Sequence, residues 1–501
     1  MAEAPRYLRI GRTDNVAVAL TDLAAGEHCC VDGLEVTLSG AVGRGHKFAL
    51  KAIPAGTAVI KYDMPIGEAT RDIAPGEFVH THNLKTRLAG ELEYTYNPVP
   101  PAPLPATEAG RTFLGFRRAD GTVGVRNDLW IIPTVGCVNK LAENLARDFE
   151  RQLPQRSVRR VLAFPHPYGC SQLGDDHETT ANMLAALAKH PNAGGVLIVA
   201  LGCENNTLES FQKRLGDCDR SRIRFLKAQE DGSEYDEGLK LLAELAEQAA
   251  KLEREPVPVS ELKVGLKCGG SDGLSGITAN PLIGRFSDLL TAAGGTSVLT
   301  EVPEMFGAET LLMNRCCNRD VFERCVKMVN DFKAYFIRHG QVVYENPSPG
   351  NKAGGISTLE EKSLGCTQKG GTGEVVDVLG YGESLRTPGL NLLSGPGNDM
   401  VATTVLTAAG AQIVLFSTGR GTPFGGPVPT VKIATNHELA ERKPNWIDFD
   451  AGVLVRGGVT LEELGRELFD YVIRLASGEV EARNETYRYQ EIAIFKDGVT
   501  L

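Results

Sequence analysis

The chain has 501 residues, of which 42% are hydrophobic and 23% are charged, and its formal net charge at pH 7 is −10. This length and composition are typical of a globular protein with about three domains. The negative charge argues against a nucleic-acid partner, because phosphate binding needs a basic surface. No apolar run is long enough to predict a membrane span, and the N-terminus lacks the apolar core of a signal peptide. We therefore expect a cytoplasmic protein whose cysteines are mostly reduced.

Residues 1–96 predict a small β-rich domain. Short apolar runs, such as residues 16–20 and 57–60, lie between turns marked by glycine. Residues 97–112 follow as a linker, and five prolines within residues 97–105 predict a stiff, extended chain there. The first domain boundary is therefore placed at this linker.

The rest of the chain predicts parallel α/β domains. Continuous apolar runs of four to six residues, such as 161–164 and 413–416, are typical of strands buried on both faces. Amphipathic patterns such as residues 236–253 predict helices between them. A polar segment at residues 254–262 contains two prolines and suggests a division into domains at 113–255 and 256–501.

Residues 165–177 contain two histidines, a cysteine and two aspartates between a predicted strand and a predicted helix. Polar groups at the carboxyl end of a parallel strand face the crevice in which α/β enzymes bind ligands. This position makes His166 and His177 candidates for a catalytic base and acid. The alternative is a structural turn in which an aspartate caps the helix.

Five cysteines stand beside a glycine, and none belongs to a Cys-x-x-Cys pair, which argues against a zinc ribbon or a redox dithiol. The five are Cys137, Cys170, Cys203, Cys268 and Cys366. Two of these turns carry further polar residues at the end of a predicted strand, and these are candidate ligands of a metal or a substrate: Asn139, Glu204 and Asn205. A tight turn with an asparagine cap is the alternative for either turn alone.

Four of the nine histidines lie in the β-rich domain. His80 and His82 are two positions apart, so in a strand they would point to the same face. Together with His46 they could ligate a metal, since imidazole is a common ligand of iron, zinc, copper and nickel. Solvent-facing strand residues are an equally good interpretation.

Several glycine-rich loops in the last half of the chain could bind a polyhydroxy anion. Residues 269–273 match the pattern G-x-S-x-G, but no good helix follows and no histidine completes a hydrolase triad. A loop that offers backbone N–H groups to a carboxylate fits better. The candidate substrate contacts in these loops are Ser271, Asp272, Asn351, Lys352, Lys369 and Arg420. Glu301 and Glu304, after another strand, could bind a metal or act as a base, or belong to a plain loop.

Long segments of the chain resemble the UxaA family of sugar-acid dehydratases. They include residues 45–50, 124–127, 168–177, 201–206, 268–281, 344–355 and 416–436. The resemblance implies an N-terminal SAF-type β domain joined to α/β domains, and Fe(II) or Mn(II) as cofactor. The implied reaction, in hexuronate catabolism, converts D-altronate into 2-dehydro-3-deoxy-D-gluconate and water. Galactarate or a related hydroxy acid is the alternative substrate.

Residue types suggest one site between the β domain and the α/β body. In this hypothesis His46, His80 and His82 bind the metal from one side, and Cys137, Cys170, Cys203 or Glu204 bind it from the other. His166 and His177 would exchange protons, while Lys352, Lys369 and Arg420 would hold the substrate. An iron–sulfur dehydratase that uses three glycine-flanked cysteines is one rival interpretation, and a non-catalytic sugar-acid sensor is another. A homo-oligomer is compatible with the sequence.

Overall fold

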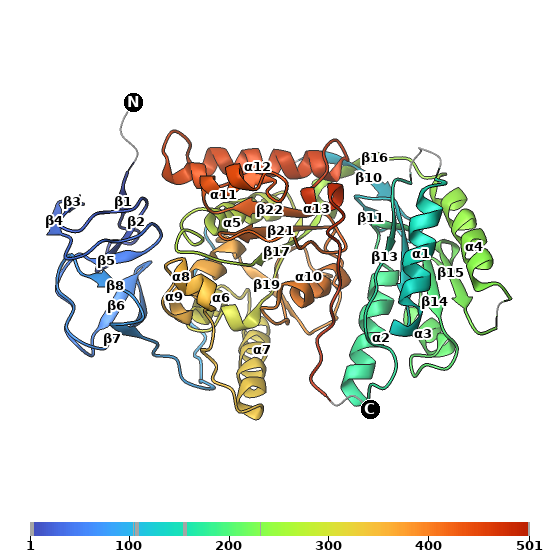
Figure 1. The fold of residues 1–501 in the computed structure, drawn as a ribbon, viewed down its shortest axis with the longest axis horizontal. Coiled ribbons are helices and arrows are strands. Elements are labelled where there is room, and N and C mark those ends of the chain that lie inside the picture. The colour runs from blue at the N-terminus through green and yellow to red at the C-terminus, as the bar shows by residue number, and fades with distance from the viewer. Residues whose placement is uncertain (1–4, 104, 106–109, 154–157, 231, 499–501) are drawn as a thin grey trace.

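The computed structural model describes residues 5–103, 105, 110–153, 158–230 and 232–498. The chain forms a row of three bodies, with the C-terminal domain in the middle, the N-terminal β domain at one end and the second domain at the other (Figure 1). None of the helices in these described residues has the length and apolar character that a membrane crossing requires.

The N-terminal domain contains short antiparallel strands, as expected for a SAF-type domain. One sheet has the order β1-β2-β5-β8, another has the order β6-β7-β9, and β3 pairs with β4. The strands are β1 (Tyr7–Leu8), β2 (Val16–Ala19), β3 (His28–Val31), β4 (Leu34–Thr37), β5 (Lys47–Ala49), β6 (Ala58–Lys61), β7 (Met64–Ala69), β8 (Phe78–Val79) and β9 (Leu84–Lys85). Because β8 ends at Val79, His80 and His82 lie in the following turn. The prediction that they share one face of a strand is wrong.

The second domain is a four-stranded parallel sheet with helices on both faces, in the order β13-β12-β14-β15. A small antiparallel sheet, β11-β10-β16, joins it to the C-terminal domain, and β16 lies in the polar segment expected to separate the two. The elements are β10 (Thr112–Arg117), β11 (Val123–Gly124), β12 (Asp128–Pro133), η1 (Gly136–Val138), α1 (Asn139–Glu150), β13 (Val161–Ala163), α2 (Gly174–Ala188), β14 (Ala193–Ala200), α3 (Leu208–Leu215), η2 (Arg220–Arg222), β15 (Ile223–Lys227), α4 (Glu234–Ala249) and β16 (Glu255–Pro258).

The C-terminal domain is built on a seven-stranded, fully parallel sheet in the order β19-β20-β18-β17-β21-β22-β23. Its strands are β17 (Lys263–Cys268), β18 (Thr296–Leu299), β19 (Val375–Leu379), β20 (Gly389–Leu393), β21 (Ile413–Thr418), β22 (Thr430–Ala434) and β23 (Phe449–Asp450). Its helices are η3 (Val259–Glu261), α5 (Ala279–Ala292), η4 (Val302–Glu304), α6 (Glu309–Met313), α7 (Arg319–Arg338), α8 (Pro349–Ala353), α9 (Leu359–Cys366), η5 (Thr367–Gly370), α10 (Asp399–Ala408), α11 (His437–Arg442), η6 (Gly452–Val455), α12 (Leu461–Ala476) and α13 (Arg483–Thr486). The expected α/β fold with parallel sheets is confirmed.

The apolar strands of this sheet are covered on both faces, as their composition predicts. Val264 and Leu266 of β17 join the core formed with α5 and α12, whereas a side chain at Gly265 would meet Leu406 of α10 on the other face. After β17 the chain builds β18, β19 and β20 on one side, then returns to place β21 on the other side of β17. The crevice at the carboxyl ends of β17 and β21 is therefore the topological switch point, where open α/β sheets bind ligands.

Candidate active site

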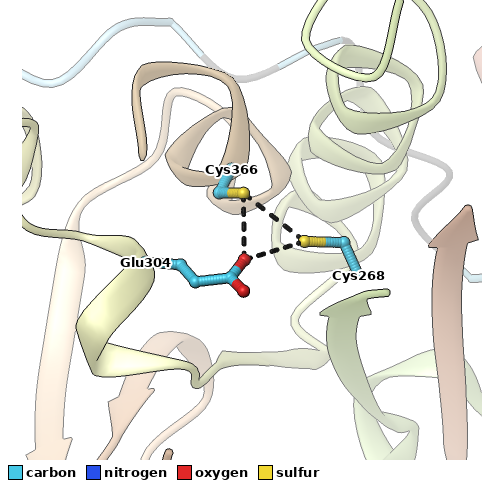
Figure 2. A group of neighbouring side chains, drawn as sticks. All are labelled: Cys268, Glu304 and Cys366. Atoms are coloured by element: carbon cyan, nitrogen blue, oxygen red, sulfur yellow. Dashed lines mark hydrogen bonds between the residues drawn. The ribbon is translucent and has the colours of Figure 1, made fainter. Parts of the chain in front are cut away.

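Two cysteines and a glutamate meet at the carboxyl edge of this sheet, after β17 and β18 (Figure 2), and all three side chains are buried. The sulfur atoms of Cys268 and Cys366 are 3.4 Å apart. Oε2 of Glu304 lies 3.3 Å from the Cys268 sulfur and 3.2 Å from the Cys366 sulfur. Among the described residues, this is the one group of three histidine, cysteine or acidic ligands whose donor atoms lie within 4.8 Å of one another.

Three different elements bring these donors together. Cys268 is the last residue of β17, Glu304 lies in η4 after β18, and Cys366 is the last residue of α9. The turn into η4 is held in an uncommon conformation, because Glu301 has a φ of 70° although it is not a glycine. Such strain persists where the surrounding contacts impose it, and it is common at functional sites.

Three buried lysines surround the triad and form ion pairs with three carboxylates. Lys369 lies 2.9 Å from the Cys268 sulfur and 3.2 Å from Glu301, and Lys362 lies 2.9 Å from Glu304. Lys267 bonds to Glu301 and lies 2.9 Å from the third carboxylate, that of Asp399. Charged groups at this depth are tolerated only when they are paired and hydrogen-bonded.

The electrostatic balance of this cluster favours an ionised Glu304 and protonated lysines. Burial alone would raise the pKa of Glu304, but Lys362, Lys267 and Lys369 overcome this effect and lower the pKa to about 2. Burial opposes the charge on Lys369, yet the neighbouring Cys268 and Glu301 raise its pKa well above the ordinary value. The Cys366 thiol is different, because its hydrogen bond with Cys268 and its burial raise its pKa.

A cavity of about 500 Å³ opens beside the triad and is lined by Cys268 and Glu304. Lys352 lines it as well, and its ammonium group forms no ion pair or hydrogen bond with the described residues. The Glu345 carboxylate lines the same cavity and likewise lacks a partner among those residues. The expected substrate contact Asn351 is buried at the cavity wall, and its side-chain amide donates a hydrogen bond of 2.8 Å to the Ser271 carbonyl. The cavity thus offers a cation and a carboxylate that have no side-chain partner among the described residues, near the three donors.

Other expected substrate contacts lie at a second cavity. Asp272 and Arg420 line a second cavity of about 290 Å³ together with Arg44 of the SAF domain. The Asp272 carboxylate accepts hydrogen bonds from Thr435 and Asn436, and burial raises its pKa. The Ser271 hydroxyl is buried, and no histidine accompanies it, so the nucleophile-elbow interpretation gains no support.

The SAF domain packs directly on the segment that leads into α9. The Glu361 carboxylate lies between Lys47 and Lys61, at 2.8 Å from each ammonium group. Nδ1 of His80 is 2.7 Å from the Ser357 hydroxyl. The His46 ring lies 5.4 Å from the His80 ring, whereas His82 is exposed and stacks on Phe78. These contacts place the histidines at the domain interface, and within the described part of the chain none of them contacts the cysteine–glutamate triad.

The remaining expected site residues belong to the second domain. His166 is buried, with Nε2 at 2.7 Å from the Pro133 carbonyl and Nδ1 accepting from the Tyr168 amide. Both ring nitrogens are therefore engaged in holding the loop. The Glu204 carboxylate accepts from Thr134 and two backbone amides, which lower its pKa against the effect of burial. This carboxylate is therefore used to stabilise the turn that carries it.

The arrangement expected from residue types is therefore corrected. It placed His46, His80 and His82 opposite Cys137, Cys170, Cys203 or Glu204 in one site, but the C-terminal domain lies between the two groups (Figure 1). His166, His177, Asn139 and Asn205 belong to the second domain, and none of them lines the cavity. The physical reason is that the chain has two parallel sheets, each with its own carboxyl edge, and a sequence does not show which strand ends share an edge.

Models of three known domain families match successive parts of the chain. Residues 5–87 match the altronate/galactarate dehydratase SAF domain, residues 115–250 the second domain of D-galactarate dehydratase/altronate hydrolase, and residues 259–500 the C-terminal domain of D-galactarate/altronate dehydratase. The chain is 55% identical to an altronate dehydratase of Bacillus subtilis (strain 168), over 99% of each chain. It is 56% identical to an altronate dehydratase of Escherichia coli (strain K12), over 99% of this chain and 100% of the relative. A galactarate dehydratase (L-threo-forming) of Escherichia coli (strain K12) is 34% identical, over 98% of this chain and 96% of the relative.

Proposed function

Because the chain belongs to the D-galactarate/altronate dehydratase family, we propose that it removes water from D-altronate to give 2-dehydro-3-deoxy-D-gluconate. The relatives at 55% and 56% identity are named for altronate, and the one at 34% for galactarate, which favours altronate as the substrate. The observation that carries the proposal is the buried Cys268–Glu304–Cys366 triad beside a cavity with a lysine and a carboxylate that are unpaired among the described residues.

The reaction is a β-elimination. A base takes the proton on C2, the hydroxyl on C3 leaves as water, and the resulting enol becomes a ketone. A proton next to a carboxylate is very weakly acidic, so the extra negative charge must be stabilised in the transition state. A site for this reaction therefore needs positive charge at the substrate carboxylate and a base near C2.

The triad fits a divalent metal ion. Its donor atoms are 3.2–3.4 Å apart, which suits ligands that share one ion through bonds of about 2.0–2.3 Å. Soft thiolate ligands favour iron over manganese. Such an ion supplies Lewis-acid stabilisation of the developing negative charge.

The charge of the surrounding cluster supports this assignment. Lys267, Lys362 and Lys369 balance Glu301, Glu304 and Asp399 when both thiols are protonated. Exchange of two thiol protons for one divalent ion leaves that balance unchanged. The cluster can therefore bind the ion without leaving an uncompensated buried charge, which would be costly.

The free side chains of the cavity take the remaining roles in this proposal. Lys352 meets the substrate carboxylate, because its ammonium lines the cavity without a partner among the described residues. Glu345 accepts the C2 proton, since Asp399, the other acid exposed to the cavity, is engaged by Lys267 at 2.9 Å. These roles replace those expected for His166 and His177.

A panel of hexonates, assayed anaerobically with and without added Fe(II) for 2-keto-3-deoxy acid formation, tests the function. We expect turnover of D-altronate that exceeds turnover of galactarate and depends on the added iron. Cys268→Ala should abolish it, while Cys317→Ala, which alters an exposed thiol outside the cavity, should not. Binding of D-altronate without turnover by iron-loaded protein would contradict the proposal and support a sensor.

A further inference from the structure

Three glycine–cysteine turns lie at the carboxyl edge of the second domain's sheet, and none of their residues lines the cavity of the C-terminal domain. Cys137 follows β12, Cys170 follows β13 and Cys203 follows β14, and these three parallel strands are neighbours in the sheet. Carboxyl ends of parallel strands meet at the same edge, so the three thiols project from adjacent loops. Of the five exposed cysteines among the described residues, three are these.

Backbone hydrogen bonds join the three loops to one another. The Gly136 amide donates to the Tyr168 carbonyl at 2.9 Å, and the Asn206 amide donates to the Gly169 carbonyl at 3.1 Å. The Ser171 amide donates to Asn205 Oδ1, and Ser171 itself has a φ of 60°. The loop that carries Cys170 is thus held against the loops that carry the other two thiols.

The glycine beside each cysteine is what allows this close approach. A side chain at Gly136 would lie 2.8 Å from the His166 carbonyl oxygen, and one at Gly169 would lie 2.0 Å from the Thr134 carbonyl oxygen. A side chain at Gly202 would lie 2.7 Å from Oε1 of Gln229, and Gly202 has a φ of 130°. The glycines are therefore required for packing, whereas exposed cysteines contribute little to it.

The thiols at this edge make only long contacts with the described residues. The Glu204 carboxylate is occupied by Thr134 and the amides of its turn. The Cys203 sulfur has a long contact of 3.6 Å with Gln229, and the Cys170 sulfur lies 4.0 Å from the Ser171 hydroxyl. Three accessible thiols with weak contacts are available for a soft metal.

We propose that Cys137, Cys170 and Cys203 hold a [4Fe–4S] cluster, each thiol losing its proton to become a ligand of one iron. The fourth iron is left without a protein ligand. A single ion fits less well, because the three sulfur atoms do not all lie within 4.8 Å of one another. A [2Fe–2S] centre would need a fourth protein ligand. This cluster is separate from the ion proposed at Cys268, Glu304 and Cys366.

Anaerobic reconstitution with Fe(III), sulfide and a dithiol that reduces part of the iron to Fe(II) tests the proposal, using a Cys268→Ala/Cys366→Ala background to remove iron from the other site. We expect about four irons and four acid-labile sulfides per chain, with a brown absorption band. A further Cys137→Ala/Cys170→Ala/Cys203→Ala substitution should remove all of these signals. Exposed thiols contribute little to folding, so the circular dichroism spectrum and melting temperature should stay close to those of the background.

Cys30→Ala/Cys317→Ala, introduced into the same background, is the matched control, because these exposed thiols lie in the other two domains. It should retain the full iron, sulfide and absorption. The proposal is overturned if the background protein takes up no acid-labile sulfide, or if the triple variant keeps it. Loss of altronate turnover in the background leaves these readouts unaffected, so they are independent of the proposed function.

Discussion

The ammonium nitrogen of Lys369 lies 2.9 Å from the sulfur of Cys268, and both side chains are buried. The same ammonium lies 3.2 Å from Glu301. Lys369 therefore places a positive charge between the Cys268 sulfur and the Glu301 carboxylate in this buried cluster. A bound divalent ion would replace two thiol protons, which leaves the charge balance of the cluster unchanged.

Lys369→Met should destabilise the protein by about 3–5 kcal/mol, because it removes one of the two buried ammonium groups that pair with Glu301 and upsets the charge balance of the cluster. Chemical denaturation with both circular dichroism and fluorescence measures the change. Lys327→Met is the control, since it removes an exposed ion pair with Asp331 and should change stability by less than about 1 kcal/mol. Equal losses in the two variants would show that the buried pair has no special role.

Metal binding should release protons and weaken as the pH falls. The pKa of the Cys366 thiol is raised by its hydrogen bond with Cys268 and by burial, so this thiol is protonated at neutral pH before an ion binds. Each proton displaced makes the apparent affinity fall about tenfold per pH unit below that pKa. Calorimetry of Fe(II) binding in buffers of different ionisation enthalpy measures the number released. A pH-independent affinity with no proton release would exclude Cys366 as a ligand.

Glu361→Gln should loosen the contact between the SAF domain and α9. The variant leaves Lys47 and Lys61 buried without their shared carboxylate, at a cost of about 3–5 kcal/mol. Limited proteolysis at the domain junction and thermal unfolding measure the effect. Glu68→Gln is the control, because its ion pair with Lys85 is largely exposed.

The same carboxylate gives a pH signature. Burial alone would raise the pKa of Glu361, but Lys47 and Lys61 lower it to about 2, below its value of about 4.3 in an unfolded chain. Its stabilising contribution is therefore complete above pH of about 4.3 and is lost as the pH falls toward 2. Glu361→Gln should flatten this part of the stability profile. An unchanged slope would mean that other groups dominate acid unfolding.

Lys352→Met should raise KM for D-altronate at least tenfold, with little change in stability, because its ammonium lacks an ion pair among the described residues. Lys352→Arg retains the charge and should recover part of the affinity. Steady-state kinetics with thermal unfolding separates the two effects. An unchanged KM in Lys352→Met would remove this lysine from the substrate site.

Much of the fold follows from local patterns in the sequence. The runs at residues 129–133, 161–164 and 264–266 form β12, β13 and β17, because continuous apolar stretches need burial on both faces. The helix expected at residues 236–253 is α4 (Glu234–Ala249), whose capping serine sets an earlier start. Strands β19 and β20 were not predicted, since their polar residues interrupt the apolar run.

The candidate site could be predicted only in part. The sequence indicates Cys268 and Cys366 as candidates because each stands beside a glycine, and Glu304 because it follows a predicted strand. No local pattern predicts that the three side chains lie together. Their meeting depends on the order β18-β17-β21 and on the docking of α9, which are long-range features. By contrast, Lys352 and Asn351 were expected near the substrate because their loop is rich in polar residues, and both lie at the cavity.

Anaerobic titration of metal-stripped protein with Fe(II), with D-altronate turnover recorded at each point, tests the central claim most directly. We predict negligible turnover without metal and full activity at about one tightly bound ion per chain, with neither in Cys268→Ala/Cys366→Ala. Full-speed dehydration by the stripped protein, or its restoration by iron in the double variant, would contradict the account.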